Sequence, residues 1–483
     1  MPCPLRAAIA ATVLLLASSA YAAQPTLSDV MAELARLSAR IDQLERRNAE
    51  LEAYRASIDA GLANENVSEK EPELTARLKS VEYTALDIQK QAKVIDSIEG
   101  FSAGGSFVMT GQKASGAGER CALLNYRADI TVTTPTVKTG DIESKLFGHF
   151  RAGQGKGLAE KMTSFVGPNA TAFQLGAVVP PETSAVLLAQ AWYQADIPLP
   201  VGGFKPHSRE KLTVNLGKMD PFAFFDQNAA GNDETRQFLA STFVHNALLD
   251  NPLAANVGAD GFGFSPGVRV SYLNEHAKPE RYRLSLGVFG AGESTSFNAP
   301  FRSPFVIAQA ETEQRLFAGL VGNYRVLLWR NGQAPTFVRG ETRPHAGIGL
   351  NFDQRLHDGI VAFGRFGVAR GNRLPFDRTL SAGAEFSGSY WGRGGDAVGL
   401  ALGVNHTSAD FRALSASVDA DGDGVPDFGY TASGSERVLE GYYRYRVNKR
   451  FELTPDLQVI GNPGGNAWAP AVKVLGLRAQ ITY

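Results

Sequence analysis

The chain has 483 residues, and its charges nearly balance, with 48 lysines and arginines against 49 aspartates and glutamates. The formal net charge of -1 gives no indication of nucleic-acid binding. Beyond the N-terminal region there is no apolar run of about 18 residues, so no membrane-spanning helix is expected. If this chain crosses a membrane, it must do so as a closed barrel, because that is the other structure that satisfies every backbone group in lipid.

The N-terminus has the features of an export signal. Arg6 supplies a positive charge, Ala7 to Ala17 an apolar region, and Ala20-Tyr21-Ala22 a small-residue cleavage site. We expect a signal peptide over 1–22. Cys3 precedes the apolar region and does not resemble a lipoprotein site, so Cys121 is expected to be the single cysteine of the mature chain, without a disulfide partner.

A heptad pattern follows and predicts a periplasmic coiled coil within a helical segment over 23–99. Chance periodicity is disfavoured because the steps of three and four persist for about five heptads. Asn48 in the seam favours one register and oligomeric state, and we expect a homo-oligomer, most simply a trimer. A single amphipathic helix packed on a core is the alternative, disfavoured by the charged residues on both flanks of the seam. The two seam positions are Leu27, Leu34, Ile41, Asn48, Arg55 and Leu62, and Val30, Leu37, Leu44, Leu51 and Ile58.

From residue 100 onward the apolar period changes to two, which is typical of strands with one apolar and one polar face. One such strand places Leu187, Ala189, Ala191 and Tyr193 opposite Gln190 and Trp192, and another is expected to run from Arg315 to Leu328. The segments predict an all-β transmembrane barrel over 100–483 with about 16 antiparallel strands. Gly392 to Asp396 is expected to be a short periplasmic turn and Thr407 to Ser435 a long external loop. Between Gly290 and Pro344 two long connections leave the sidedness open.

The last strand, Val472 to Tyr483, favours a membrane barrel over a soluble β-sandwich, although alternation alone fits both. Its apolar residues fall at every second position and end on an aromatic ring. This stretch resembles the C-terminal signal read by the outer-membrane assembly machinery. Together with the export signal and the lack of structural cysteines, it predicts the outer membrane of a Gram-negative bacterium, with membrane lipid around the barrel.

Several segments resemble the bacterial carbohydrate-selective porin family (OprB-like). The resemblance lies in Asn215 to Asn228 with Gln237-Phe238-Leu239, in Gly392 to Asp396, and most specifically in Glu436 to Arg444, Thr454 to Gln458 and Asn462 to Gly465. It covers residues 100–483 and implies an outer-membrane channel for passive uptake of mono- or oligosaccharides, narrowed by an inward-folded loop. That loop would correspond to residues 220–251, with Phe222, Phe224, Phe225, Asp226 and Asn228 as candidate lining residues.

Strand alternation also predicts the chemistry of the barrel interior. Arginines provide rigid forks of donors and carboxylates provide acceptors for sugar hydroxyls, and Trp192 offers a stacking surface. The structural alternative is that these side chains only fill and solvate a wide lumen in cross-strand pairs. The candidate substrate-binding set is Arg127, Glu143, Arg151, Trp192, Asp196, Asp226, Arg283, Arg325, Arg444, Arg446 and Arg478, and further interior positions are Asp129, Arg281 and Arg315.

An acidic segment, Asp419 to Asp427, has the spacing of a calcium-binding loop. Asp419, Asp421, Asp423 and Asp427 offer carboxylates, and Gly424 permits a sharp turn. The pattern resembles the short calcium loops of thrombospondin-type and dockerin repeats, and Tyr430 at the twelfth position departs from an EF-hand. A flexible acidic surface loop is the alternative. Calcium, if bound, would stiffen an external loop, and no other cofactor is expected.

Catalytic motifs are absent or out of context, so we do not expect an enzyme. Gly100 to Gly104 fits the G-x-S-x-G pattern but precedes a strand rather than following one. Two functions compete with sugar uptake: an anion or phosphate porin, which needs a lumen of unpaired basic residues, and a structural tether to the cell wall, for which no wall-binding module is recognised.

Overall fold

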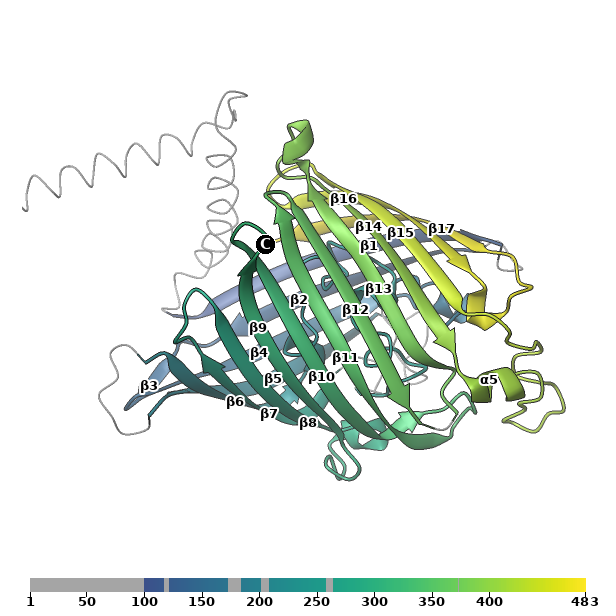
Figure 1. Ribbon diagram of the computed structural model, residues 1–483, viewed down its shortest axis with the longest axis horizontal. Coiled ribbons are helices and arrows are strands. Elements are labelled where there is room, and N and C mark those ends of the chain that lie inside the picture. Colours follow the sequence, from purple (N-terminus) through teal and green to yellow (C-terminus); the bar gives the residue numbers. More distant parts are fainter. Residues whose placement is uncertain (1–99, 117–120, 173–183, 201–207, 258–263, 372) are drawn as a thin grey trace, which may run out of the picture. The chain divides into compact units, whose positions relative to one another are not determined.

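The computed structural model describes residues 100–116, 121–172, 184–200, 208–257, 264–371 and 373–483 (Figure 1). The predicted signal peptide and coiled coil lie outside these residues. The described strands are β1 (Ser102–Ser115), β2 (Cys121–Thr133), β3 (Val137–Thr139), β4 (Ile142–Gln154), β5 (Ala185–Pro198), β6 (Glu210–Met219), β7 (Ser265–Asn274), β8 (Arg281–Phe289), β9 (Phe305–Leu316), β10 (Leu320–Pro335), β11 (Thr342–His357), β12 (Ile360–Arg370), β13 (Phe376–Ser387), β14 (Ala397–Thr407), β15 (Glu436–Arg446), β16 (Phe451–Gly461) and β17 (Val472–Thr482).

The strands form one closed antiparallel barrel. Each strand pairs with the next along the chain, and β17 returns to β1, with Met109 opposite Ala479. Both β2 and the short β3 pair with β4, so together they occupy one strand position in the wall. The 17 labelled strands therefore form a wall of 16 strands, as the sequence predicted. Closure leaves no edge strand with unpaired backbone groups, which is the requirement for crossing lipid. Among the described residues, no helix is long and apolar enough to cross a bilayer.

The two faces of the wall have the polarity of a membrane barrel. On β17, the outward residues Leu475 and Leu477 are 63 % and 50 % exposed, whereas the inward residue Arg478 is 1 % exposed. The same alternation places Leu400, Leu402 and Leu439 on the outer surface. The apolar face therefore points outward and the polar face inward, the reverse of a soluble sandwich.

The connections differ in length at the two ends of the barrel, as predicted. Residues 388–396 form a short turn with the 3-10 helix η4 (Gly388–Trp391), and residues 408–435 form a long loop with α5 (Ala409–Leu414). The connections 290–304, which contains η3 (Gly292–Ser296), and 336–341 both lie at the long-loop end. This answers the open question of sidedness between 290 and 344.

The prediction of one strand from Arg315 to Leu328 was wrong. A tight turn at Phe317, Ala318 and Gly319, all with positive φ, separates β9 from β10, and Leu316 pairs with Leu320. Because the turn has three residues, the apolar residues on both sides of it keep the same phase, and the pattern reads as one continuous strand.

The predicted orientation of the first half of β5 was also wrong. Val186 is 77 % exposed and Leu188 faces lipid with it, whereas Ala189 is fully buried. A β-bulge lies where His149 and Phe150 of β4 pair with Gln190 and Leu188, and it shifts the phase by one residue. Beyond the bulge the prediction is confirmed, because Trp192 lies on the inward side opposite Phe147.

The long-loop half of the barrel is filled by loops rather than left open. The loop after β6, which contains η2 (Pro221–Ala223) and α4 (Ser241–Val244), packs its apolar side chains against inward residues of the wall. Phe225, Phe243 and Leu248 on this loop are fully buried. The loop after β4, with η1 (Ala159–Lys161), and η5 (Pro463–Gly465) contribute to the same packing at this end.

Candidate functional site in the narrowed lumen

A buried ion pair fastens the inward loop to the wall. Arg365 on β12 and Asp226 on the loop are both fully buried, with 3.1 Å between Nε and the carboxylate. The same guanidinium donates to the backbone oxygens of Phe243 at 2.9 Å and Asp226 at 3.0 Å. Asn351 on β11 adds donations to Asp226, including one of 2.6 Å to its carboxylate. Asp226 was expected to line the passage, and the structure instead places its carboxylate in the loop's attachment.

The opposite wall holds the loop through backbone atoms. The Glu440 carboxylate on β15 accepts from the amides of Leu239 and Ala240, and Arg478 on β17 donates to the carbonyls of Glu234 and Gln237, each at 2.8 Å. Because Glu440 and Arg478 bind backbone atoms, they fix the backbone position of the loop independently of its side chains. The predicted lumen residue Arg478 therefore positions the loop and is nearly inaccessible to a solute.

Where the loop faces β2 and β4, charged side chains form a compact network. Arg127 reaches Glu234 of the loop at 2.8 Å and Asp129 at 2.9 Å, and Asp129 also contacts Arg151 at 2.6 Å and His149 at 2.7 Å. Burial acts to raise the pKa of Glu234, but Arg127 and Arg151 outweigh it, so this pKa lies below its usual value. Both predicted arginines thus lie at the narrowed section, already paired with acids.

Two titratable groups lie where the loop leaves β6. Asp220 caps η2, accepting from the amide of Phe222 at 2.9 Å, and burial raises its pKa to about 6. His245 contacts Asp250 at 2.7 Å. Burial alone would lower the pKa of His245, but the hydrogen bond with Asp250 and that carboxylate's charge raise it above its ordinary value. The part of the inward loop that carries Asp220 and His245 therefore changes its charge near neutral pH.

A second group of paired charges lies on β8 to β11. Arg325 contacts Glu311 at 3.3 Å and Asp353 at 2.8 Å, and Arg283 lies 3.9 Å from Glu311. Arg281 and Arg315 both contact Glu313, at 2.8 and 3.2 Å. The acids of this group were not predicted, although Glu311 and Glu313 lie on β9, the strand of the predicted interior residue Arg315.

Arg269 on β7 is a further interior residue that the sequence reasoning missed. Its guanidinium lies 5.0 Å from the ring centre of Phe224 on the inward loop and donates to Asn215 at 3.0 Å and Ser285 at 3.2 Å. The alternation of Val268 and Val270, both exposed to lipid, was the signal that could have placed Arg269 inside.

The predicted aromatic platform lies on the inward side of β5. Trp192 stacks on Phe147 at 4.6 Å between ring centres and meets the edge of Phe224 at 5.6 Å. Its indole nitrogen donates to Gln190 at 3.2 Å. Further along the same strand, Asp196 accepts from Thr213 at 2.6 Å. Aromatic surface and hydrogen-bonding groups therefore follow one strand.

The remaining predicted lumen residues lie toward the short-turn end. Glu143 pairs with Lys138 at 2.8 Å, and both side chains are largely exposed. Arg444 lies 3.3 Å from Glu385, and Arg446 lies 3.2 Å from Glu452. Glu452 also binds Arg236 of the inward loop at 2.7 Å. The structure thus distributes the predicted residues along the lumen rather than gathering them at one point.

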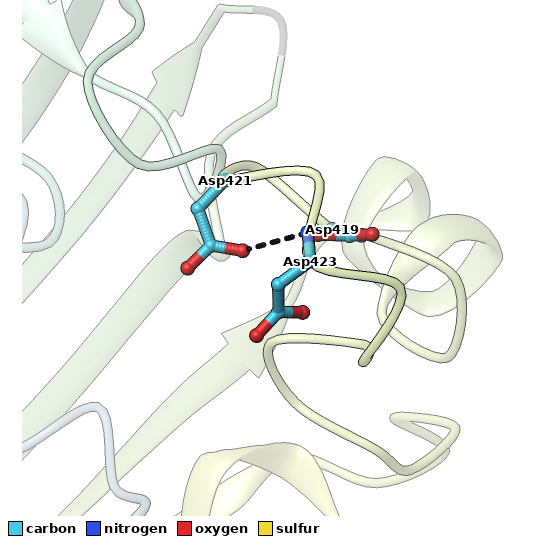
Figure 2. Close-up of side chains that lie close together, drawn as sticks. All are labelled: Asp419, Asp421 and Asp423. Atoms are coloured by element: carbon cyan, nitrogen blue, oxygen red, sulfur yellow. Dashed lines mark hydrogen bonds between the residues drawn. The ribbon is translucent and has the colours of Figure 1, made fainter.

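The acidic segment lies apart from the lumen, in the loop between β14 and β15. Figure 2 shows Asp419, Asp421 and Asp423 close together on this loop, and one carboxylate oxygen of each lies within 4.8 Å of the others. Asp427 does not join them and accepts from the amide of Ala420 at 3.0 Å. Calcium prefers oxygen ligands, and these three carboxylates supply them. Calcium binding at this loop remains a prediction.

A closed 16-stranded barrel that is apolar outside, charged inside and narrowed by an inward loop is an outer-membrane porin. The profile of the family described as "Carbohydrate-selective porin, OprB family" matches residues 150–483. The chain belongs to this family, whose members are channels and not enzymes.

Two relatives illustrate the likeness. The chain is 26 % identical over 161 residues to Porin AaxA of Chlamydia pneumoniae, and this match spans a third of each chain. The high-pH structure of Pseudomonas putida OprB superposes with a TM-score of 0.61 at 17 % identity, covering 82 % of this chain and 96 % of that one. At this identity the likeness supports the fold.

Proposed function

We propose that this porin lets mono- and oligosaccharides diffuse passively through the outer membrane into the periplasm. The observation that carries the proposal is the pairing of interior charges. Arg127, Arg151 and Arg325 each contact a carboxylate within 3.3 Å. A lumen of paired charges offers donors and acceptors to a neutral, hydroxyl-rich solute without a strong net attraction for ions. The family description agrees with this substrate class.

The lumen can replace the hydration of a sugar step by step. Guanidinium groups donate in fixed planar forks, carboxylates accept, and the indole of Trp192 offers an apolar face to the ring. Each contact has to be weak, because a permeating solute must leave as readily as it enters. The inward loop, held by Arg365, Glu440 and Arg478, keeps the passage narrow enough for such contacts.

An anion or phosphate porin is the second candidate function. It would draw on Arg269, which donates hydrogen bonds to the neutral side chains of Asn215 and Ser285. The acids around the other interior arginines argue against it. A structural tether is a third candidate and would need no open passage.

Single-channel conductance of the full-length protein in planar bilayers, titrated with glucose, maltodextrins and phosphate, separates these functions. Blockade by sugars supports sugar uptake, whereas preferential blockade by phosphate supports the anion porin. If the protein shows no conductance, the structural tether is the remaining candidate function.

Substituting Trp192→Ala tests the aromatic platform. We expect the dissociation constant for maltodextrin blockade to rise about three- to tenfold, the range of a lost aromatic contact, while ion conductance stays nearly unchanged. Trp391→Ala is the matched control, because Trp391 lies in the exposed turn after β13. Equal blockade in the Trp192 variant and in wild type would remove Trp192 from the sugar path.

A further inference from the structure

Six basic side chains lie on the outer wall near the long-loop end of the barrel, and we call them the outer basic row. All six are exposed and occupy outward strand positions. For four of them, an exposed leucine (Leu328, Leu380, Leu439 or Leu475) lies two positions nearer the short-turn end. The outer basic row consists of Arg330 on β10, Arg370 on β12, Arg378 on β13, Arg437 on β15, Lys473 on β17 and Lys113 on β1.

The strand register brings members of the row together. Ala346 of β11 pairs with Arg330 on one side and with Arg370 on the other. Two strand spacings separate these arginines, so their Cα atoms lie roughly 10 Å apart. The small side chain of Ala346 leaves open space between the two guanidinium groups. Lys113 pairs with Leu475, two residues from Lys473, so the lysines form a second close pair.

The height of the row coincides with the edge of the hydrocarbon layer. The 11 residues of β12 end at Arg370, and at a tilt of about 40° they rise roughly 25–30 Å, close to the height of the apolar band of such barrels. The opposite edge carries exposed aromatic residues, Tyr282, Tyr445 and Tyr483. Basic charge at one edge and aromatic rings at the other locate both boundaries of the lipid.

The charges of the row differ from those of the lumen in their partners. Within the described residues, Arg330, Arg370 and Arg437 have no carboxylate within ion-pair distance, and neither lysine has one. Arg378 is the exception, with Asp377 at 3.4 Å. Lumen arginines such as Arg127, Arg151 and Arg325 are matched by acids, whereas the outward ones other than Arg378 face the membrane without them. An anion supplied by the surroundings would complete the row.

We propose that the outer basic row binds the phosphate groups of a phosphorylated lipid in the outer leaflet, with Arg330 and Arg370 as the central pair. A guanidinium group matches phosphate in planar, two-pronged hydrogen bonds. The acyl chains of the same lipid lie on the apolar band below, against Leu328, Ile348 and Phe366, which are exposed to it. This inference needs the membrane position of the barrel and does not depend on sugar uptake.

The test uses the full-length protein in detergent and native mass spectrometry. The probes are bisphosphorylated lipid A and the same lipid after removal of its phosphates. We expect the wild type to retain the phosphorylated form preferentially. The double substitution Arg330→Gln with Arg370→Gln should weaken its retention by about thirtyfold, since two basic residues near a lipid surface are lost.

Lys278→Gln is the matched control, because Lys278 is exposed at the short-turn end. It should retain the phosphorylated lipid as the wild type does. Unchanged single-channel conductance and sugar blockade in the double variant will show that its barrel is folded and its lumen intact. Equal retention of both lipid forms by the wild type, or equal retention of the phosphorylated lipid by wild type and double variant, would overturn the proposal.

Discussion

At the scale of single residues, the ion pair between Arg365 and Asp226 is the attachment on which the loop depends most. Replacing Arg365 by Gln leaves a fully buried carboxylate without its counter-charge. We expect the free energy of unfolding to fall by about 3–5 kcal/mol, measured by urea unfolding in detergent. Adding Asp226→Asn should recover part of that loss, because the unpaired charge is then removed.

A more exposed ion pair serves as the control for this prediction. Arg315 contacts Glu313 at 3.2 Å with a partly exposed guanidinium, and Arg315→Gln should cost no more than about 1 kcal/mol. If both arginine substitutions reduce stability equally, burial does not set the strength of the Arg365 contact.

Asp220 predicts a pH dependence of ion selectivity. Its carboxyl group lies in the loop directly after β6, and its pKa is raised to about 6 by burial. Below that pH the group is neutral, and above it the section gains one negative charge, so the cation-to-anion permeability ratio should rise as pH rises through about 6. His245, whose pKa is raised above its ordinary value, loses its positive charge at higher pH and acts in the same direction.

Reversal potentials measured in a salt gradient from pH 5 to pH 8 test this dependence. Asp220→Asn should remove the part of the change near pH 6 and leave the part due to His245, whereas His245→Gln should do the opposite. A permeability ratio in Asp220→Asn that still rises through pH 6 as in wild type would assign the change to another group.

At the scale of elements, the loop between β14 and β15 carries the calcium prediction. Its three neighbouring carboxylates accept hydrogen bonds from backbone amides; for example, the amide of Gly424 donates to Asp419 at 2.9 Å. We expect calcium affinity on the order of 0.1–1 mM, typical of extracellular modules, measured by competition with luminescent terbium. Asp421→Asn with Asp423→Asn should abolish binding, and Asp410→Asn on α5 should not. Undiminished terbium emission in the double variant would contradict a site at these residues.

At the scale of the whole molecule, the coiled coil predicted over 23–99 remains a prediction about oligomeric state. We expect the full-length protein in detergent to be a trimer by light scattering corrected for detergent. Leu37→Asp with Leu44→Asp places two charges in the apolar seam and should produce monomers. Arg46→Asp, outside the seam, should leave the trimer intact. A double variant that remains trimeric would show that the barrels associate without this seam.

How much could be predicted from the sequence depended on whether a property is local. The inward placement of Arg127, Arg151 and Arg325 follows from alternation along one strand, and the structure agrees. The bulge in β5 and the three-residue turn after β9 were missed, because each changes or conceals the phase without a distinctive local signal. The attachment of Asp226 to Arg365 joins residues 139 positions apart, and no periodicity encodes it.

Period-two alternation and an aromatic final strand were enough to predict the class of structure, because a closed barrel is the way for such strands to satisfy the backbone in lipid. The folded barrel was needed to see which interior charges are paired, where the loop is attached, and that outward basic residues from six strands form one row. These properties depend on barrel closure and strand register, which bring together residues that are distant along the chain.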